Sequence, residues 1–371
     1  MTASAASDHA FMGTALALAQ RGLGNSAPNP AVGCIVVKDG AIVGRGWTQP
    51  GGRPHAETEA LKRAGAAAKN ATAYVTLEPC CHTGQTPPCT DALINAGVAR
   101  VVIAVSDPDD RVDGGGVAAL EDAGLDVVTG VREAEALEVN AGFFKRTRTG
   151  LPFIALKSAS SLDGRIALAN GSSQWITGTV ARRYGHLLRA SYDAIVVGSG
   201  TVLADNPQLT CRLPGFQGPH PVRVVLDRRL RIKPDAAVAA SAREVPTWVV
   251  TSATADKSKS TELENTGVRI LTAADPSDHA FARAAASLLA EQGLDRVLIE
   301  GGGQIAASFL HDGLIDRVYA VRSGSILGAD GRAAMADLNL KSLDEAPVFI
   351  RSDQRRLGDD LLEILDQSPT V

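Results

Sequence analysis

The sequence has few aromatic residues, little net charge and no long apolar run. Aromatic side chains make up 4% of its 371 residues, and 37 Lys and Arg against 41 Asp and Glu give a formal net charge of −4. A nucleic-acid site needs a basic surface with stacking rings, so this composition argues against a nucleic-acid partner. A membrane span needs about 18 unbroken apolar residues, and no segment approaches that length. We therefore expect a small-molecule partner and no membrane association.

Cysteines are few and odd in number. Of the five, Cys80, Cys81 and Cys89 crowd into one short segment. Segment 1–22 lacks the basic stretch of an export signal and has apolar residues at helical spacing, which predicts an amphipathic helix. These features indicate a cytoplasmic protein with reduced thiols and a metal site.

The length favours two domains, because 371 residues exceed what one hydrophobic core usually serves. Short β-rich runs alternate with Ala-rich helical segments, which predicts α/β layers in both halves. The expected strands lie at 33–38, 73–77 and 100–105, and then at 194–198, 222–227, 246–251 and 296–300. Gly150 and Pro152 interrupt the chain between the two sets. We place the domains at 1–149 and 150–371.

The clearest chemical pattern joins His55, Cys80 and Cys89. One imidazole and two thiolates are a familiar zinc set, and three protein ligands leave the fourth tetrahedral position open for water. Zinc lowers the pKa of that water to about 7, so hydroxide becomes available at neutral pH. Glu57, two residues after His55, can carry a proton from the water to a leaving nitrogen. The pattern predicts a catalytic zinc site for deamination, with Glu57 as its catalytic residue.

A closed structural zinc module is the alternative for this segment. Cys81 or His82 could then serve as a fourth ligand and exclude water. The eight residues between the two expected cysteine ligands disfavour it, because structural fingers use short paired spacings. Pro87 and Pro88 favour a helix start, which would place Cys89 in a first turn whose backbone N–H groups stabilise a thiolate.

Three segments of the first half resemble the deaminase half of the bifunctional deaminase/reductase of riboflavin biosynthesis. They are 26–33 (SAPNPAVG), 55–57 (HAE) and 79–89 (PCCHTGQTPPC). Cytidine and tRNA-adenosine deaminases share the His-x-Glu motif but place their cysteines two residues apart, so the long loop favours the riboflavin branch. The resemblance implies that Asn29 and His82 contact the pyrimidine.

Two positions depart from that family's pattern. Gln85 stands where members often have a basic residue, and Thr48 stands where they often have a His. Both positions are expected to bind substrate and not metal. Another cation, such as Arg53, could hold the substrate phosphate in place of a basic residue at 85.

The second half carries a further set of short motifs. In chain order they are Lys157 on an expected strand, 161–165 (SLDGR), 171–176 (GSSQWI), 201–207 (TVLADNP) and 300–304 (EGGGQ). The glycines of the last motif follow an expected strand and precede an expected helix, so bare N–H groups could approach a pyrophosphate there. Taken alone, this motif fits a tight strand-to-helix turn as well as a phosphate-binding turn, because its glycines lack the spacing of the Rossmann fingerprint.

In this order, the motifs resemble the reductase half of the same family, whose fold is like dihydrofolate reductase and whose cofactor is NADPH. The resemblance implies cofactor contacts from Ala159, Trp175, Thr201, Asp205, Gly301, Gly302 and Gly303, and substrate contacts from Ser173, Arg189, Leu209, Arg212 and Glu300. The two arginines suit a 5′-phosphate, because guanidinium donors pair with phosphate oxygens. Lys157 is a candidate catalytic residue for opening the sugar ring before hydride transfer, or else an ordinary strand-edge lysine.

The combined expectation is a cytidine-deaminase-like α/β/α sandwich followed by a dihydrofolate-reductase-like α/β domain. With Zn²⁺, the first would deaminate 2,5-diamino-6-ribosylamino-4(3H)-pyrimidinone 5′-phosphate. With NADPH, the second would reduce the ribosyl group of the resulting 5-amino-6-ribosylaminouracil 5′-phosphate to ribityl. The resemblance also implies a homodimer formed through the reductase domain.

Two other functions stay open at this point. One is a nucleoside or nucleic-acid deaminase with an unrelated appended domain, and the other is a zinc-stabilised protein that senses a dinucleotide. The basic run 228–233 (RRLRIK) invites a nucleic-acid or 2′-phosphate interpretation, but we favour a solvated turn because the net charge is negative.

Overall fold

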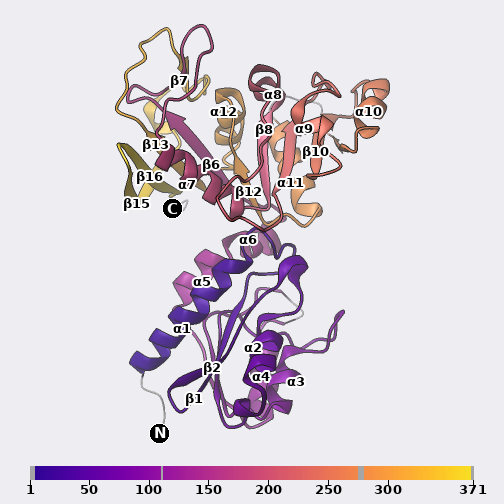
Figure 1. Cartoon of the computed structure of the whole chain (residues 1–371), viewed down its shortest axis with the longest axis vertical. Helices are drawn as coiled ribbons and strands as arrows, with labels where there is room; N and C mark the ends of the chain where they lie inside the picture. The colour runs from indigo at the N-terminus through magenta and orange to yellow at the C-terminus, as the bar shows by residue number, and fades with distance from the viewer. Residues whose placement is uncertain (1–4, 110–111, 275–279, 369–371) are drawn as a thin grey trace. The chain divides into compact units, whose positions relative to one another are not determined.

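The structure is a computed structural model that describes residues 5–109, 112–274 and 280–368. The chain divides into two compact units, Met1–Gly150 and Leu151–Val371. The division follows helix α6 (Ala141–Thr149), where Gly150 ends the helix in the left-handed conformation. Each unit has its own sheet (Figure 1). Each also has its own hydrophobic core.

The first unit is a five-stranded sheet with helices on both faces. Its strand order is β2 (Ala41–Trp47), β1 (Gly33–Lys38), β3 (Thr72–Val75), β4 (Arg100–Ile103) and β5 (Asp126–Val128). β1 runs antiparallel to β2 and β3, and the last three strands are parallel. Helices α1 (Ala5–Ala19) and α5 (Glu133–Val139) lie on one side of the sheet, and α2 (Ala56–Ala64), α3 (Cys89–Asn95) and α4 (Gly115–Asp122) on the other (Figure 1).

Glycines in β2 let α2 lie against the sheet. A Cβ atom at Gly46 would stand 2.0 Å from the carbonyl oxygen of Ala56, and one at Gly44 would stand 2.2 Å from that of Ala60. A side chain at Gly46 would therefore push away the first turn of α2, which contains Glu57 and directly follows His55. The close packing fixes both residues relative to the sheet.

The second unit is built on a nine-stranded sheet. Its order is β11 (Arg269–Ala273), β10 (Thr247–Ser252), β9 (Val222–Leu226), β8 (Ala194–Gly198), β12 (Arg296–Ile299), β6 (Phe153–Ser160), β13 (Arg317–Arg322), β16 (Asp360–Gln367) and β15 (Phe349–Leu357). The strands from β11 to β13 are parallel, and β16 and β15 extend the sheet antiparallel. A separate ribbon pairs β7 (Arg165–Ala167) with β14 (Arg332–Ala333).

Helices cover both faces of the parallel part of that sheet. They are α7 (Thr179–Ala190), α8 (Ser199–Asp205), α9 (Ala237–Ala240), α10 (Lys257–Glu264), α11 (Phe281–Glu291) and α12 (Gly303–His311). Alternate residues of β8 enter different cores: Val196 packs with α11 and α12, whereas Ile195 packs with residues of α9 and α10. A strand buried on both faces reads as an unbroken apolar run, which is how the sequence shows it.

The expected strands are confirmed as β1, β3, β4, β8, β9, β10 and β12, and segment 1–22 contains helix α1. The sequence did not predict β15, whose side chains are largely exposed and polar and therefore resemble a loop. No helix of the described residues is both long and apolar enough to span a membrane.

Candidate active sites

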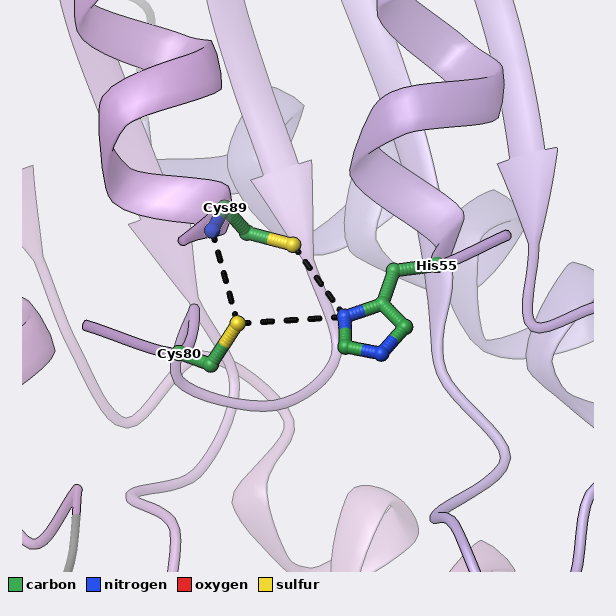
Figure 2. Close-up of side chains that lie close together, drawn as sticks. All are labelled: His55, Cys80 and Cys89. Atoms are coloured by element: carbon green, nitrogen blue, oxygen red, sulfur yellow. Dashed lines mark hydrogen bonds between the residues drawn. The ribbon is translucent and has the colours of Figure 1, made fainter. Parts of the chain in front are cut away.

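Three donor side chains of the first unit converge on one point (Figure 2). His55 precedes α2, Cys80 lies in the loop after β3, and Cys89 begins α3. His55 Nδ1 lies 3.3 Å from Cys89 Sγ and 3.8 Å from Cys80 Sγ, and the three donor atoms all lie within 4.8 Å of one another. One nitrogen and two sulfurs at these separations fit the ligand set and size of a zinc centre.

The start of α3 favours a thiolate beside it. The backbone N–H of Cys89 donates to Cys80 Sγ over 3.4 Å, and Pro88 is the N-cap, which confirms the expected helix start. The hydrogen bond from the Cys89 thiol lowers the pKa of Cys80 below its usual value, and His55 adds to this effect. The same bond, together with burial, raises the pKa of Cys89. The metal-free cluster thus holds a negative charge on Cys80, ready for a cation.

Glu57 stands next to the cluster in the first turn of α2. Its side chain is buried, and burial raises the pKa of its carboxyl group above the usual value. Cys89 is within hydrogen-bonding reach of it, and His55 and Cys80 act on it electrostatically. A carboxyl group with a raised pKa, held beside three metal donors, is suited to moving protons at neutral pH.

Neither alternative fourth ligand belongs to this cluster among the residues that the structure describes. Cys81 Sγ lies against Gly115, where an added Cβ would stand 3.1 Å from the sulfur. His82 Nδ1 is buried and has no hydrogen-bond partner in the described part of the chain. The geometry therefore favours a three-ligand centre over a closed structural module.

Asn29 lies on a loop that Thr48 holds in place. The hydroxyl of buried Thr48 accepts from Val32 N–H and donates to the carbonyl of Pro30, both over 2.9 Å. Asn29 also packs against Gly52, which has a φ of +83° and where a Cβ would stand 1.9 Å from Asn29 Nδ2. Thr48 therefore orders this loop from a buried position.

The two other positions discussed for the substrate phosphate differ in exposure. Gln85 is exposed, whereas Arg53 is partly buried, and its Nε has no hydrogen-bond partner among the described residues. A buried guanidinium nitrogen without a partner is a better candidate for binding an anion than an exposed amide.

Glu78 was not predicted from the sequence, although it stands two residues before Cys80. Its buried carboxylate accepts four backbone N–H groups, from Asp107 (3.3 Å), Gly114 (3.2 Å), Gly116 (2.9 Å) and Val117 (3.0 Å). It thereby fastens the start of α4 to the metal-binding loop. Asp107 beside it is buried as well, and burial raises its pKa to about 6.

The second unit contains a cavity of about 720 Å³. Nine of the expected residues line it: Lys157, Ala159, Ser173, Thr201, Asp205, Glu300, Gly301, Gly302 and Gly303. Gly171 of the 171–176 motif lines it as well. Lys157 lies on β6 between β12 and β13, so it is not an edge-strand lysine. The cavity follows the carboxyl ends of parallel strands, where α/β sheets usually bind ligands.

The glycine turn is shaped for close backbone approach. A Cβ at Gly301 would stand 3.0 Å from Thr201 Oγ1, and Gly302 has a φ of +61° at the N-cap of α12. Both positions therefore disfavour a side chain, and both line the cavity at the start of α12.

Four of the expected residues do not line this cavity: Trp175, Arg189, Leu209 and Arg212. Trp175 is 67% exposed and its ring lies 4.6 Å from the Arg182 guanidinium. Arg189 instead pairs with Glu300 and donates to the carbonyl of Thr210, and the backbone N–H of Arg212 donates to His186 Nδ1. Leu209 is buried in the core that contains Ile195 and residues of α9 and α10.

Arg189 and Glu300 form a buried fork. Arg189 Nε and Nη2 donate to the two Glu300 oxygens over 2.7 and 2.8 Å, and Nη1 donates to the carbonyl of Thr210 over 2.8 Å. Burial raises the pKa of Glu300, but the Arg189 cation outweighs it and holds that pKa below the usual value. Glu300 is therefore an anion at neutral pH.

Arg231 and Arg332 also line the cavity, and the motifs had singled out neither. Arg231 belongs to the basic run 228–233 and donates to Ser199 Oγ over 2.7 Å. The solvated-turn interpretation is incomplete for Arg231, which is exposed but faces the cavity. Arg332 lies in the two-residue strand β14, too short to leave a pattern in the sequence.

Both halves of the chain match known protein families. Residues 152–357 match the RibD C-terminal domain, and residues 5–105 match the cytidine and deoxycytidylate deaminase zinc-binding region. The riboflavin biosynthesis protein RibD of Escherichia coli is 43% identical over 365 residues, which cover 95% of this chain and 98% of that protein. This chain belongs to the RibD family. The RibD of Bacillus amyloliquefaciens is 40% identical over 95% of this chain and 94% of its own.

Solved structures of RibD proteins share the whole architecture. Acinetobacter baumannii RibD, form 1, is 37% identical with a TM-score of 0.89 over 99% of this chain and 100% of its own. The Thermotoga maritima diaminohydroxyphosphoribosylaminopyrimidine deaminase/5-amino-6-(5-phosphoribosylamino)uracil reductase is 35% identical with a TM-score of 0.86, over 98% and 99% of the two chains. The expected fold class, a cytidine-deaminase-like domain followed by a dihydrofolate-reductase-like domain, is confirmed.

As a RibD family member, the chain is a bifunctional enzyme of riboflavin biosynthesis, with a zinc-dependent deaminase followed by an NADPH-dependent reductase. Membership over nearly the full chain excludes an unrelated appended domain and a binding protein without catalysis.

Proposed function

We propose that the first unit deaminates 2,5-diamino-6-ribosylamino-4(3H)-pyrimidinone 5′-phosphate, and that the second reduces the ribosyl group of the product to ribityl. The observation that carries this proposal is the convergence of His55, Cys80 and Cys89 beside the buried carboxyl group of Glu57. Those four residues, combined with a separate glycine-lined cavity, supply one site for hydrolysis and one for hydride transfer.

In the deaminase, His55, Cys80 and Cys89 would hold the zinc ion. When bound, zinc acts as a Lewis acid that makes water a better nucleophile. Glu57 accepts a proton from the attacking water and delivers it to the amino nitrogen, which leaves the ring as ammonia. Asn29 and His82 orient the pyrimidine, and the unpartnered Nε of Arg53 supports a contact with the substrate phosphate.

In the reductase, the cavity would hold the dinucleotide. NADPH supplies the hydride. The start of α12 at Gly301, Gly302 and Gly303 binds its phosphates, and Ala159, Thr201 and Asp205 bind the remainder, because all of these residues line the cavity. Trp175 would join the cofactor by a movement of its exposed ring.

At the substrate end of the reductase, Lys157 acts as the catalytic residue. Its ammonium group protonates the sugar ring oxygen as the ribosylamine opens. Glu300, ionised and held by Arg189, lies close enough to Lys157 to interact with it electrostatically and orients the substrate together with Ser173. Arg189 Nε and Nη2 both donate to Glu300, so Arg189 acts by positioning Glu300. Arg212 then binds the 5′-phosphate.

We also propose that two copies associate through the reductase unit. β15 is the outer strand of the nine-stranded sheet, and apolar side chains are exposed on it and just before it, at Leu343, Val348 and Ile350. An outer strand with apolar neighbours is suited to pairing with a second copy. None of the five cysteines, all of which lie in the described residues, forms a disulfide, and this together with the use of NADPH supports a cytoplasmic location.

Product analysis tests the two-step proposal. Purified, zinc-loaded protein should release ammonia from the diaminopyrimidine phosphate without NADPH, and should yield the ribityl product only when NADPH is added. Removal of zinc with a chelator should stop ammonia release but leave reduction of the supplied deaminated intermediate. NADPH oxidation that requires the undeaminated substrate would contradict the order of the steps.

A further inference from the structure

His186 in the second unit belongs to none of the motifs discussed above. It lies on α7 three residues before Arg189, so the two side chains share one face of the helix. Lys157, Arg189, Arg212 and Glu300 all act on His186 electrostatically. The imidazole is therefore placed among the residues proposed to bind the reductase substrate.

Three hydrogen bonds fasten segment 209–212 to α7 and fix the His186 ring. The backbone N–H of Arg212 donates to His186 Nδ1 over 3.3 Å, and the Cys211 thiol donates to the carbonyl of His186 over 3.3 Å. The third is the bond from Arg189 to the Thr210 carbonyl. Because Nδ1 accepts a hydrogen bond, the ring proton of the neutral imidazole lies on Nε2.

The charges around the ring favour an anionic ligand. Lys157, Arg189 and Arg212 are cations, and among the residues that the structure describes only Arg189 forms an ion pair, with Glu300. Burial, together with Arg189 and Arg212, lowers the pKa of His186, so the imidazole is neutral at neutral pH. A neutral N–H donor beside two cations adds a hydrogen bond to an anion without further charge repulsion among the protein groups.

We propose that His186 is a substrate-binding residue of the reductase, and that its Nε2–H donates to the 5′-phosphate that Arg212 binds. This inference rests on the proposed function, since it requires a phosphorylated ribosylamine as the reductase substrate. The histidine then contributes to selection of the phosphorylated substrate over the corresponding nucleoside. It has a second task, because its Nδ1 holds the Arg212 backbone in position.

Two substitutions separate the tasks. In His186→Asn the side-chain oxygen can still accept from Arg212 N–H, but no donor stands at the Nε2 position. In His186→Gln the amide NH₂ can replace the Nε2–H donor, but the acceptor is lost. Arg183→Gln, at an exposed position of the same helix, is the matched control. The steady-state kinetics of each variant are measured with 5-amino-6-ribosylaminouracil 5′-phosphate and with the same compound lacking the phosphate.

We expect His186→Asn to raise KM for the phosphorylated substrate about tenfold, because a hydrogen bond to a charged group is lost. Its kcat, its KM for NADPH and its kinetics with the nucleoside should match those of Arg183→Gln, and His186→Gln should recover part of the affinity. An unchanged KM in His186→Asn, or an equal rise for both substrates, would overturn the proposal. If the unsubstituted enzyme does not reduce the phosphorylated substrate at all, the proposed function fails first and the assignment of His186 falls with it.

Discussion

The two sites of this chain are assembled in different ways. The metal-binding residues come from one short stretch, 55–89, and their donor atoms lie within 4.8 Å of one another. The reductase cavity draws its lining from segments that begin at Leu156 and end at Ala336. A metal centre concentrates its chemistry in a few bonds, whereas a dinucleotide site spreads its binding energy over many weak contacts. Substitution of a single metal ligand should therefore abolish deamination, whereas loss of a single cofactor contact should only weaken NADPH binding.

The largest effect should follow loss of a thiolate. Cys80→Ser or Cys89→Ser should remove the zinc and lower deaminase activity by at least ~1000-fold, because a neutral hydroxyl is a poor substitute for a thiolate ligand. Cys81→Ser is the control and should retain the metal. Metal analysis and ammonia release measure both outcomes, and a metal-free Cys81→Ser beside a metal-loaded Cys80→Ser would refute the ligand assignment.

A smaller loss is expected where the metal stays. Glu57→Gln should keep zinc and fold, yet reduce deamination ~100- to 10,000-fold, because the amide cannot carry the proton. Glu59→Gln, which removes the ion pair with Arg63 on the same helix, should behave like the unsubstituted enzyme. Both variants should still oxidise NADPH when given the deaminated intermediate. Failure of Glu57→Gln in that assay would mean that the two sites are coupled.

In the reductase, a single contact should matter less. Asp205→Ala removes one side chain from the cavity lining and should weaken NADPH binding by about tenfold or less, the equivalent of one hydrogen bond. Asp235→Ala, at an exposed position, is the matched control. NADPH titration measures the effect, and ammonia release should be normal in both. A complete loss of reduction would show that this site also depends on one residue.

The smallest effect concerns stability and pH. The folded-state pKa of Asp107 is raised to about 6 from the ordinary 3.8, so its stabilising contribution is complete below about pH 4 and is lost as pH rises through 6. Asp107→Asn does not titrate and should gain up to ~2 kcal/mol in unfolding free energy over the unsubstituted protein between pH 4.5 and 7.5. Thermal unfolding at both pH values, with the exposed Asp113→Asn as control, measures this gain. A gain of equal size at both pH values would exclude titration of Asp107 as its cause.

The metal cluster could be predicted from the sequence because its signals are local. His55, Cys80 and Cys89 carry their chemistry in their residue types, and a proline pair marks the helix that starts at Cys89. No sequence pattern indicates the role of Glu78, because that role depends on four backbone N–H groups that only the folded loop brings together.

The reductase site was less accessible to sequence reasoning. The strands buried on both faces were found from their apolar runs, whereas polar β15 and the two-residue β14 were not. Arg332 lines the cavity from a two-residue strand and Arg231 from a segment outside any helix or strand, and neither kind of segment leaves a periodic pattern. The pairing of Arg189 with Glu300 joins residues from α7 and from the end of β12, and residue type alone cannot distinguish a positioning arginine from one that binds phosphate.

The central place of β6 affects how the protein is made. This strand comes first in its unit, yet its two sheet partners, β12 and β13, lie far downstream in the chain. On the ribosome, residues 1–150 contain all the strands of their sheet and can fold as they emerge, while β6 must wait for nearly the whole remainder of the polypeptide. Until β12 and β13 have been synthesised, the apolar residues of β6 have no sheet partners. The incomplete reductase unit is therefore the part of the nascent chain most exposed to aggregation and most dependent on chaperones.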